Sequence, residues 1–490
     1  MNRRDFLKTA TLAAASLAIP GCTKSKLGPT YCYKRLNFVF ILIDDMGFKD
    51  AGCYGSTFYE TPNIDNLAAE GMRFTNAYAA CPVCSPTRAS ILTGKYPARI
   101  NLTDWIPGRQ THGPRPHEKL IGPRFSQQMA LKELTVAEAL KDAGYATCFI
   151  GKWHLGNEMY YPEYQGFDKN IAGISYGWPV GGYFSPYKNP KIKDGPEGEY
   201  LTDRLTDEAL KFLTRNKDKP FLLYLSHYAV HTPLQSKKEL IEKYQAKVAK
   251  MPPPKGPRFL PEGKKKARQI QDHAVYAGMI QSTDESLGRI TKKLKDLGLA
   301  DDTAIIFMSD NGGLSTAEGS PTSNLPLRAG KGWLYEGGIR EPMIIKWPGV
   351  VKPGTICHEP VISNDFYPTM LEMAGLPLRQ NQHIDGLSLI PLLTGTASLY
   401  RNALYWHYPH YSNQGGSPAA AVRSGDYKLI EFYEDNRLEL YNLKDDISEK
   451  NNLAEKMPRK TAQLRKMLHM WQKSVNARMP EPNPNYQPEE

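Results

Sequence analysis

Short apolar runs, rich in β-branched and aromatic residues, alternate along most of the chain with segments of helical periodicity. The apolar runs predict buried strands at Phe38–Ile43, Ala146–Ile150, Phe221–Leu225, Thr303–Met308 and Met343–Trp347. The segments between them predict helices at Ile64–Glu70, Thr135–Ala143, Asp203–Thr214 and Tyr276–Leu297. Because parallel strands need long crossover connections, this alternation predicts an α/β fold with a large, mostly parallel sheet sandwiched by helices.

The pattern changes after Gly395, where segments rich in Tyr and His follow one another with hairpin spacing. They predict a small C-terminal antiparallel sheet with strands within 404–408, 421–432 and 438–443, plus one helix near Thr461–Val475. We therefore expect a main domain over 35–398 and a C-terminal subdomain over 399–480. The proline-rich stretch that follows predicts a loose tail over 481–490.

The first residues have the pattern of an export signal. Arg3 and Arg4 precede an apolar stretch, Thr9–Pro20, that is too short to span a bilayer. The paired arginines resemble a twin-arginine signal, and Ile19–Cys22 resembles a bacterial lipobox. We therefore expect 1–21 to be removed on export by the twin-arginine translocase, leaving a periplasmic protein or a lipoprotein anchored through Cys22 and facing outward. Cleavage without lipidation is the alternative, because Pro20 is unusual beside such a cysteine.

The composition is that of a globular protein. With 41% apolar and 23% charged residues among 490, the chain is not disordered, collagen-like or a coiled coil. Beyond the N-terminal stretch no apolar run reaches the roughly 18 residues of a membrane-spanning helix, which excludes an integral channel or carrier. The seven cysteines allow one disulfide but require none.

The net charge of +11 is concentrated between Lys237 and Arg268, where eleven Lys and Arg residues accompany three Glu. Such a run is usually a solvated surface, and contact with an anionic polymer is the alternative. No nucleic-acid partner is expected.

Polar residues follow four of the predicted strands, at Asp44-Asp45, at Gly151–His154, at His227 and His231, and at Asp310-Asn311. Ligands of open α/β sheets bind at the carboxyl ends of the strands, so these segments are expected to meet at one edge. Adjacent acids repel each other unless a cation or a proton lies between them. Three aspartates and an asparagine are hard oxygen donors, which favours Ca²⁺ or Mg²⁺ over a soft metal, whereas a single Asp is more often a turn or a cap. His227 is expected to be structural, and no zinc spacing is present.

The segment Cys84–Gly94 predicts a short helix. Ser85 suits the N-cap, Pro86 the first helical position and Gly94 the exit, which puts Cys84 at the helix N-terminus. Unpaired N–H groups and the positive end of the helix dipole favour an anion there. They would also acidify a thiol, so an unmodified catalytic cysteine is one interpretation.

These motifs resemble those of the formylglycine-dependent (type I) sulfatases, arylsulfatase-like enzymes of the alkaline phosphatase superfamily. Cys84-x-Pro86-x-Arg88, followed by Leu92-Thr93-Gly94, is similar to the signature in which this cysteine is oxidised to an aldehyde, 3-oxoalanine or formylglycine. The resemblance covers nearly all of the chain after the signal, with further matching blocks at 37–55, 151–156, 231–233, 309–313, 331–332, 336–340, 440–443 and 451–454.

The resemblance implies a sulfuric ester hydrolase and assigns a metal site. Asp44, Asp45, Asp310 and Asn311 would hold Ca²⁺ together with the modified Cys84. A formylglycine-generating maturase would be a partner of the chain.

The resemblance also assigns the catalytic roles. Arg88 would bind and polarise the formylglycine hydrate, and Lys152 and Lys331 would grip the sulfate oxygens. His154 would be the base that later releases sulfate, and His231 would protonate the leaving oxygen. The residue types suit the chemistry, because an anionic sulfate ester needs its charge neutralised as the S–O bond breaks.

Two loops are expected to lie over the site and to set its specificity, unless they are merely packed. The first, 101–124, contains Asp104, Trp105, Arg109 and His112, and the second, 174–186, is rich in Tyr, Trp and Gly. Aromatic and Arg side chains stack on sugar rings and pair with anions, which suggests a sulfated glycan as substrate. The alternatives are a phosphonate or phosphodiester hydrolase of the same superfamily and an inactive glycan-binding lipoprotein.

Overall fold

The structure is a computed structural model that describes residues 36–110 and 113–488. The predicted export signal and Cys22 lie outside these residues. The main domain is built on an eight-stranded sheet of order β12-β2-β11-β10-β1-β7-β5-β6. The strands are β1 (Asn37–Ile43), β2 (Met72–Phe74), β5 (Ala146–Gly151), β6 (Lys169–Ile171), β7 (Phe221–Ser226), β10 (Thr303–Ser309), β11 (Met343–Lys346) and β12 (Thr355–Cys357).

The sheet is mostly parallel, as predicted. From β10 to β6 all neighbouring strands run parallel, whereas β11 is antiparallel to both β10 and β2. The predicted strand 343–347 therefore exists but runs against the others. Strands β2, β6 and β12 have only three residues each, so they are too short to be predicted from an apolar run in the sequence.

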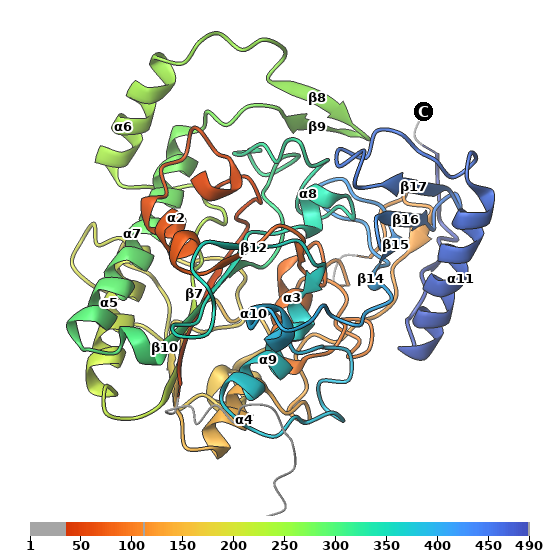
Figure 1. Cartoon of the computed structure of the whole chain (residues 1–490). Coiled ribbons are helices and arrows are strands. Elements are labelled where there is room, and N and C mark those ends of the chain that lie inside the picture. Colours follow the sequence, from red (N-terminus) through yellow and green to blue (C-terminus); the bar gives the residue numbers. More distant parts are fainter. Residues whose placement is uncertain (1–35, 111–112, 489–490) are drawn as a thin grey trace, which may run out of the picture. The chain divides into compact units, whose positions relative to one another are not determined.

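Helices cover both faces of the sheet (Figure 1). One face carries α2 (Pro62–Glu70), α5 (Leu201–Arg215) and α7 (Ala274–Asp296), with α6 (Lys238–Ala249) against α7, and the other carries α3 (Cys84–Thr93), α4 (Val136–Asp142) and α9 (Phe366–Met373). Alternate side chains of β1 supply the two cores. Val39 and Ile41 join the α2, α5 and α7 core, while the Phe40 ring lies 5.1 Å from Phe366 of α9. The four predicted helices are confirmed as α2, α4, α5 and α7.

The C-terminal subdomain is the predicted antiparallel sheet with one helix. It consists of β14 (Leu404–Tyr408), β15 (Ala419–Ser424), β16 (Tyr427–Phe432), β17 (Leu438–Asn442) and α11 (Pro458–Ser474), with the strands paired in chain order. Its core is shared with Tyr78 and Trp333 of the main domain. Lys428 of β16 is fully buried and lies 2.9 Å from Glu336 and 2.9 Å from Glu449. The subdomain is therefore joined to the main domain by apolar and ionic contacts.

The prediction of a loose tail is wrong for its first residues. Strand β18 (Glu481–Pro482) pairs with β4 (Leu120–Ile121), and Asn483 Nδ2 donates a hydrogen bond to the carbonyl of Glu118, 2.8 Å away. The backbone hydrogen bonds between β18 and β4 order this segment even though it contains prolines.

The lysine- and arginine-rich segment 237–268 forms α6 and a hairpin of β8 (Phe259–Glu262) and β9 (Lys265–Arg268). Five cysteines of the described chain are free thiols, so no disulfide forms among them. Within the same residues, no helix has both the length and the apolar character needed to cross a membrane. The remaining short elements are β3 (Ala77–Tyr78), β13 (Val361–Ile362), α8 (Glu336–Ile339), α10 (Ile390–Leu393) and the 3-10 helices Gly52–Tyr54, Glu158–Tyr160, Pro162–Tyr164, Ala300–Asp302 and Ser363–Asp365.

Candidate active site

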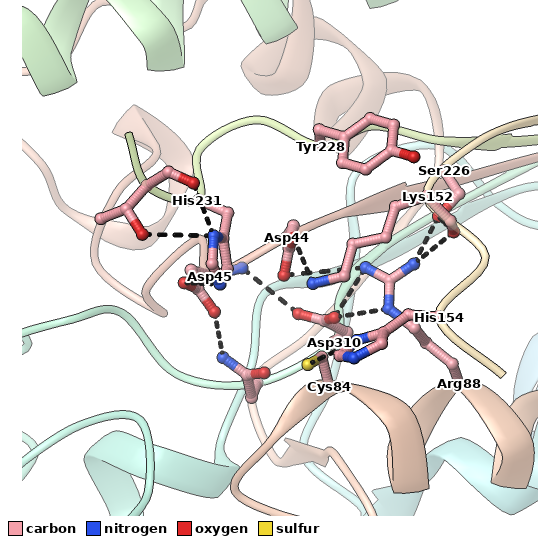
Figure 2. A network of polar contacts seen from close by, with 12 residues as sticks. Asp44, Asp45, Cys84, Arg88, Lys152, His154, Ser226, Tyr228, His231 and Asp310 are labelled. Atoms are coloured by element: carbon pink, nitrogen blue, oxygen red, sulfur yellow. Dashed lines mark hydrogen bonds and ion pairs between the residues drawn. The ribbon is translucent and has the colours of Figure 1, made fainter. Parts of the chain in front are cut away.

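The predicted polar residues converge at the carboxyl ends of β1, β5, β7 and β10 (Figure 2). Asp44 and Asp45 follow β1, and Asp310 and Asn311 follow β10, which pairs with β1 in register. One oxygen from each of the three aspartates lies within 4.8 Å of the other two. Asn311 Nδ2 donates to Asp45 Oδ1 over 2.7 Å, so this amide belongs to the same cluster. The predicted cluster of hard oxygen donors is confirmed.

The cluster fits a hard divalent cation. Asp44 Oδ1 and Asn311 Oδ1 are buried and accept no hydrogen bond from the described residues. Buried oxygens are rarely left without a donor, so these lone pairs are suited to a metal. Asp45 adopts φ 64°, an unusual conformation for a residue with a side chain, and its N–H lies 3.2 Å from Asp310 Oδ1. The donors are all oxygens, the ligands that Ca²⁺ and Mg²⁺ prefer.

Three cationic side chains balance the three carboxylates. Lys152 Nζ lies 2.6 Å from Asp44, Lys331 Nζ lies 2.7 Å from Asp45, and Arg88 Nη2 lies 2.7 Å from Asp310. All three cations are almost fully buried, so neither lysine is a surface residue.

The two adjacent aspartates differ in acidity. Burial raises the pKa of Asp44 well above its ordinary value despite Lys152. Burial also acts to raise the pKa of Asp45, but Lys331 and His231 outweigh it and hold that pKa below the ordinary range. Opposed shifts of neighbouring acids are typical of functional sites.

Cys84 lies at the N-terminus of α3, as predicted, but it is the first helical residue and the N-cap is Val83. The prediction of Ser85 as the cap is wrong, because its hydroxyl lies inside the first turn and accepts the N–H of Ile106 over 3.1 Å. Gly94 ends the helix in the left-handed conformation, as predicted. Burial raises the pKa of the Cys84 thiol although Lys152 and Lys331 lower it. The expectation of an acidified thiol is therefore wrong, because burial outweighs the neighbouring charges.

The contacts of His154 show which of its nitrogens is free. Its Nε2 contacts the carbonyl oxygen of Ile106, which can only accept, so this nitrogen carries the proton. Its Nδ1 lone pair then points to Cys84 Sγ, 3.3 Å away. Burial, followed by Lys152, lowers the pKa of His154 well below its ordinary value, so the ring is neutral. Gly177 packs on the ring so closely that a Cβ there would lie 2.5 Å from Cε1.

In His231 it is Nδ1, not Nε2, that faces a backbone carbonyl. Its Nδ1 lies 2.8 Å from the carbonyl of Thr232, and its Nε2 lies 3.8 Å from Asp45 Oδ2. Burial and Lys331 lower its pKa. His227 is structural, as predicted, because it is buried with Nε2 3.0 Å from the Ser286 hydroxyl.

Of these groups, Cys84, His154, His231 and Lys331 line a cavity of about 410 Å³, which we call the site cavity. Its lining includes Trp105 and Trp178 from the two predicted specificity loops. The complete lining is Val83, Cys84, Trp105, His154, Gly177, Trp178, His231, Thr232, Pro233, Glu318, Lys331, Asn413 and Gln414.

Two expected specificity residues do not line the site cavity. Asp104 is buried beneath the loop and accepts a hydrogen bond from the Tyr408 hydroxyl over 2.9 Å. Arg109 pairs with Glu118 and donates to Asn413 Oδ1 over 3.1 Å. His112 lies outside the described residues.

Four residues at the site were not predicted from the sequence. Ser226 accepts from Arg88 Nη1, and its position at the end of β7 could have indicated it. Glu318, Asn413 and Gln414 lie on irregular segments with no motif and reach the cavity only through the fold.

Comparison with known proteins places the chain in a family. Residues 36–376 match the sulfatase family model, and residues 329–476 match the C-terminal model of N-sulphoglucosamine sulphohydrolase. A sulfatase of Formosa agariphila is 32% identical, with 87% of this chain and 85% of the relative covered. Human N-acetylgalactosamine-6-sulfatase is 34% identical, with 76% of this chain and 68% of the relative covered.

Solved structures agree. Ps i-CgsB in complex with k-i-k-neocarrahexaose has 30% identity and a TM-score of 0.73, covering 89% of this chain and 93% of that one. A protein bound to its substrate D-glucosamine-2-N,6-O-disulfate has 25% identity and a TM-score of 0.70, covering 90% and 98%. A phosphonate monoester hydrolase at 20% identity shares the fold alone. The chain thus belongs to the sulfatase family of the alkaline phosphatase superfamily and is a sulfuric ester hydrolase.

Proposed function

We propose that this enzyme removes sulfate from sulfated carbohydrates, using Ca²⁺ and a formylglycine formed from Cys84. The observation that carries the proposal is that Cys84 and Lys331 line one cavity, while the oxygen cluster contacts Lys331 through Asp45 and the buried Lys152 through Asp44. Trp105 and Trp178 offer this cavity flat apolar faces on which sugar rings stack. Relatives named for N-acetylgalactosamine 6-sulfate and a similar structure bound to a disulfated glucosamine support a sugar substrate.

Asp44, Asp45, Asp310 and Asn311 would hold Ca²⁺ together with the modified residue 84, so that the cation offsets the sulfate charge while a formylglycine hydrate supplies the attacking hydroxyl.

The cationic residues of the chain bind and orient the ester. Lys152 and Lys331 are buried and fixed by carboxylates, so their ammonium groups are preorganised for sulfate oxygens without a reorganisation cost. Arg88 lies one helical turn after Cys84 and would bind the hydroxyl group formed there. Its Nη1 also donates to the carbonyl of Lys152 over 2.8 Å, which fixes that segment.

The two histidines would move protons in different steps of the reaction. His154 presents an unprotonated Nδ1 to position 84, which suits the base that takes a hydroxyl proton and thereby releases sulfate. His231 lines the cavity with its Nε2 3.8 Å from Asp45 Oδ2, and a proton held on this nitrogen would pass to the leaving sugar oxygen.

Mass spectrometry of the tryptic peptide Phe74–Arg88, purified from a host with a formylglycine-generating maturase, tests the nucleophile. The peptide also contains Cys81, which is buried beside Thr103 and serves as an internal control. We expect the aldehyde or its hydrate at residue 84 and an unchanged thiol at 81. An unmodified Cys84 together with no sulfate release would favour the inactive glycan-binding lipoprotein.

A substrate panel tests the reaction. We expect sulfate release from sulfated sugars to exceed phosphate or phosphonate release and to be lost in Cys84→Ala. Preference for a phosphonate or phosphodiester would instead favour the alternative hydrolase.

We also propose export by the twin-arginine translocase, with the mature protein periplasmic or anchored through a lipid on Cys22. The maturase would act first, in the cytoplasm, because this translocase passes folded proteins and Cys84 is only 3% exposed once folded. Formylglycine should therefore be present in a precursor whose export is blocked. Its presence in exported molecules alone would contradict this order.

A further inference from the structure

A second cavity of about 420 Å³, which we call the basic hollow, lies beside the site cavity. Its walls come from Arg109, residues 115–118, the β8–β9 hairpin, residues 328–335, residues 411–417 and the end of β16 with the turn that follows. Asn413 lines both cavities, so the hollow adjoins the place where the ester is cleaved. The complete lining is Arg109, Arg115, His117, Glu118, Glu262, Gly263, Lys264, Lys265, Arg328, Trp333, Tyr335, Tyr411, Ser412, Asn413, Gly415, Gly416, Ser417, Phe432, Glu434 and Arg437.

The hollow is a built feature of the fold. Gly263 at the hairpin turn approaches the Trp333 ring so closely that a Cβ there would lie 3.1 Å from it. Gly415 approaches the same ring, with its Cβ position 2.7 Å from Trp333 and 2.6 Å from the Lys265 side chain. Trp333 Nε1 donates to the carbonyl of Gln414, 3.0 Å away, and Gln414 lines the site cavity. One tryptophan therefore fixes the hairpin against the loop that separates the two cavities.

The hollow carries an excess of positive charge. Six Lys or Arg residues line it against three Glu. Glu118 is engaged by Arg109, and Glu262 by Arg328. Arg115 and Lys265 are exposed and have no ion-pair partner within the described ranges 36–110 and 113–488. Cations left without partners in a concave wall concentrate the positive potential there.

Two guanidinium groups cover the aromatic part of the wall. Arg328 lies 3.8 Å from the centre of the Tyr335 ring, and Arg437 lies 4.0 Å from that of Phe432. Arg328 is held there by Glu262 and Arg437 by Glu439, so these two groups shape the wall, and the unpaired Arg115 and Lys265 are left to bind an oxyanion.

Resting on the proposed function, we propose that the basic hollow binds a second sulfate group of the same substrate, on a sugar next to the one that is cleaved. The substrate is then a multiply sulfated oligosaccharide or polysaccharide, and the basic hairpin is its docking element. This gives the charge run of 237–268 a specific role at its C-terminal end, where Lys264 and Lys265 reach the hollow, while α6 remains a solvated helix.

The test compares the double variant Arg115→Gln/Lys265→Gln with wild type in the full chain. Lys266→Gln is the control for the Lys265 substitution, because it removes one positive charge from the neighbouring, exposed residue of β9 that does not line the hollow. Steady-state kinetics are measured on a multiply sulfated oligosaccharide and on a monosulfated monosaccharide.

We expect the double variant to lose about tenfold in kcat/KM on the oligosaccharide, mainly through KM, and to keep wild-type values on the monosaccharide. The loss should shrink at high salt. An equal loss on both substrates, no loss on the oligosaccharide, or an equal effect of Lys266→Gln would overturn the proposal.

Binding separates this inference from the proposed function. Calorimetric titration of the oligosaccharide into Cys84→Ala needs no turnover, and we expect about tenfold weaker binding when Arg115→Gln/Lys265→Gln is added. If wild type releases no sulfate but this difference is found, the hollow stands and the proposed function fails. If wild type releases sulfate but binding is unchanged by the two substitutions, the hollow is refuted and the proposed function stands.

Discussion

Replacing Lys428 with methionine is expected to destabilise the enzyme by about 3–5 kcal/mol, since it removes one member of a buried ionic cluster. The ammonium is fully buried and lies 2.9 Å from both Glu336 and Glu449. Each carboxylate keeps a partner for its other oxygen, from the Tyr78 hydroxyl and from the Glu336 N–H. Two buried oxygens are thus left unpaired, at about 1–3 kcal/mol each, which agrees with that range.

Equilibrium urea unfolding followed by tryptophan fluorescence measures the loss. Trp406 is a suitable reporter, because its ring lies 5.3 Å from that of Tyr78. With a slope of about 3 kcal/mol per M, the midpoint should fall by about 1–2 M. Lys456→Met, at an exposed position of the same subdomain, should leave it unchanged.

The pH dependence provides a second check. Burial raises the pKa of Glu449 to about 7 even with Lys428 present, and without the lysine both carboxyls should take up protons on folding. Because an acid with a raised pKa in the folded state destabilises that state as the pH rises, the deficit should shrink from pH 7 to pH 5. A deficit below 1 kcal/mol, or one that grows on acidification, would refute the reasoning.

Three further outcomes are expected. Burial raises the pKa of Asp104 to about 7, so Asp104→Asn should gain about 2–3 kcal/mol relative to wild type between pH 5 and pH 8 in urea unfolding, and a constant difference would contradict this. At Gly151, φ is 104° and a Cβ would lie 1.9 Å from the Ser226 carbonyl oxygen, so Gly151→Ala should lower the free energy of unfolding by at least about 3 kcal/mol or prevent folding. The control Gly349→Ala has φ 75° and open space around the Cβ position, so it should lower that free energy by only about 1 kcal/mol. Chelation should abolish sulfate release, and Ca²⁺ should raise the thermal midpoint of wild type but not of Asp45→Asn; equal shifts in both proteins would place the ion elsewhere.

The long, uniformly apolar strands could be predicted from the sequence, and so could the polar residues that follow them directly. Asp44 and Asp310 follow seven-residue strands, so the alternation of strands and helices was enough to bring them together. Asn413 and Gln414 were not predictable, because they reach the site cavity only after the C-terminal subdomain docks on Trp333. Asp104 illustrates the opposite error. It lies in a loop over the site, but its partner Tyr408 is remote in sequence, and that contact buries it.

Strand β18 ties residues 481–483 to the wall of the basic hollow. Asn483 bonds the carbonyl of a residue that precedes it by 365 positions, and this residue, Glu118, lines the basic hollow. Removal of residues 481–490 by a protease would therefore be expected to release the loop that carries Arg115. If the basic hollow binds a second sulfate as proposed, such an enzyme would keep its catalytic groups yet handle long substrates poorly, so an affinity tag is better placed where it leaves residues 481–483 undisturbed.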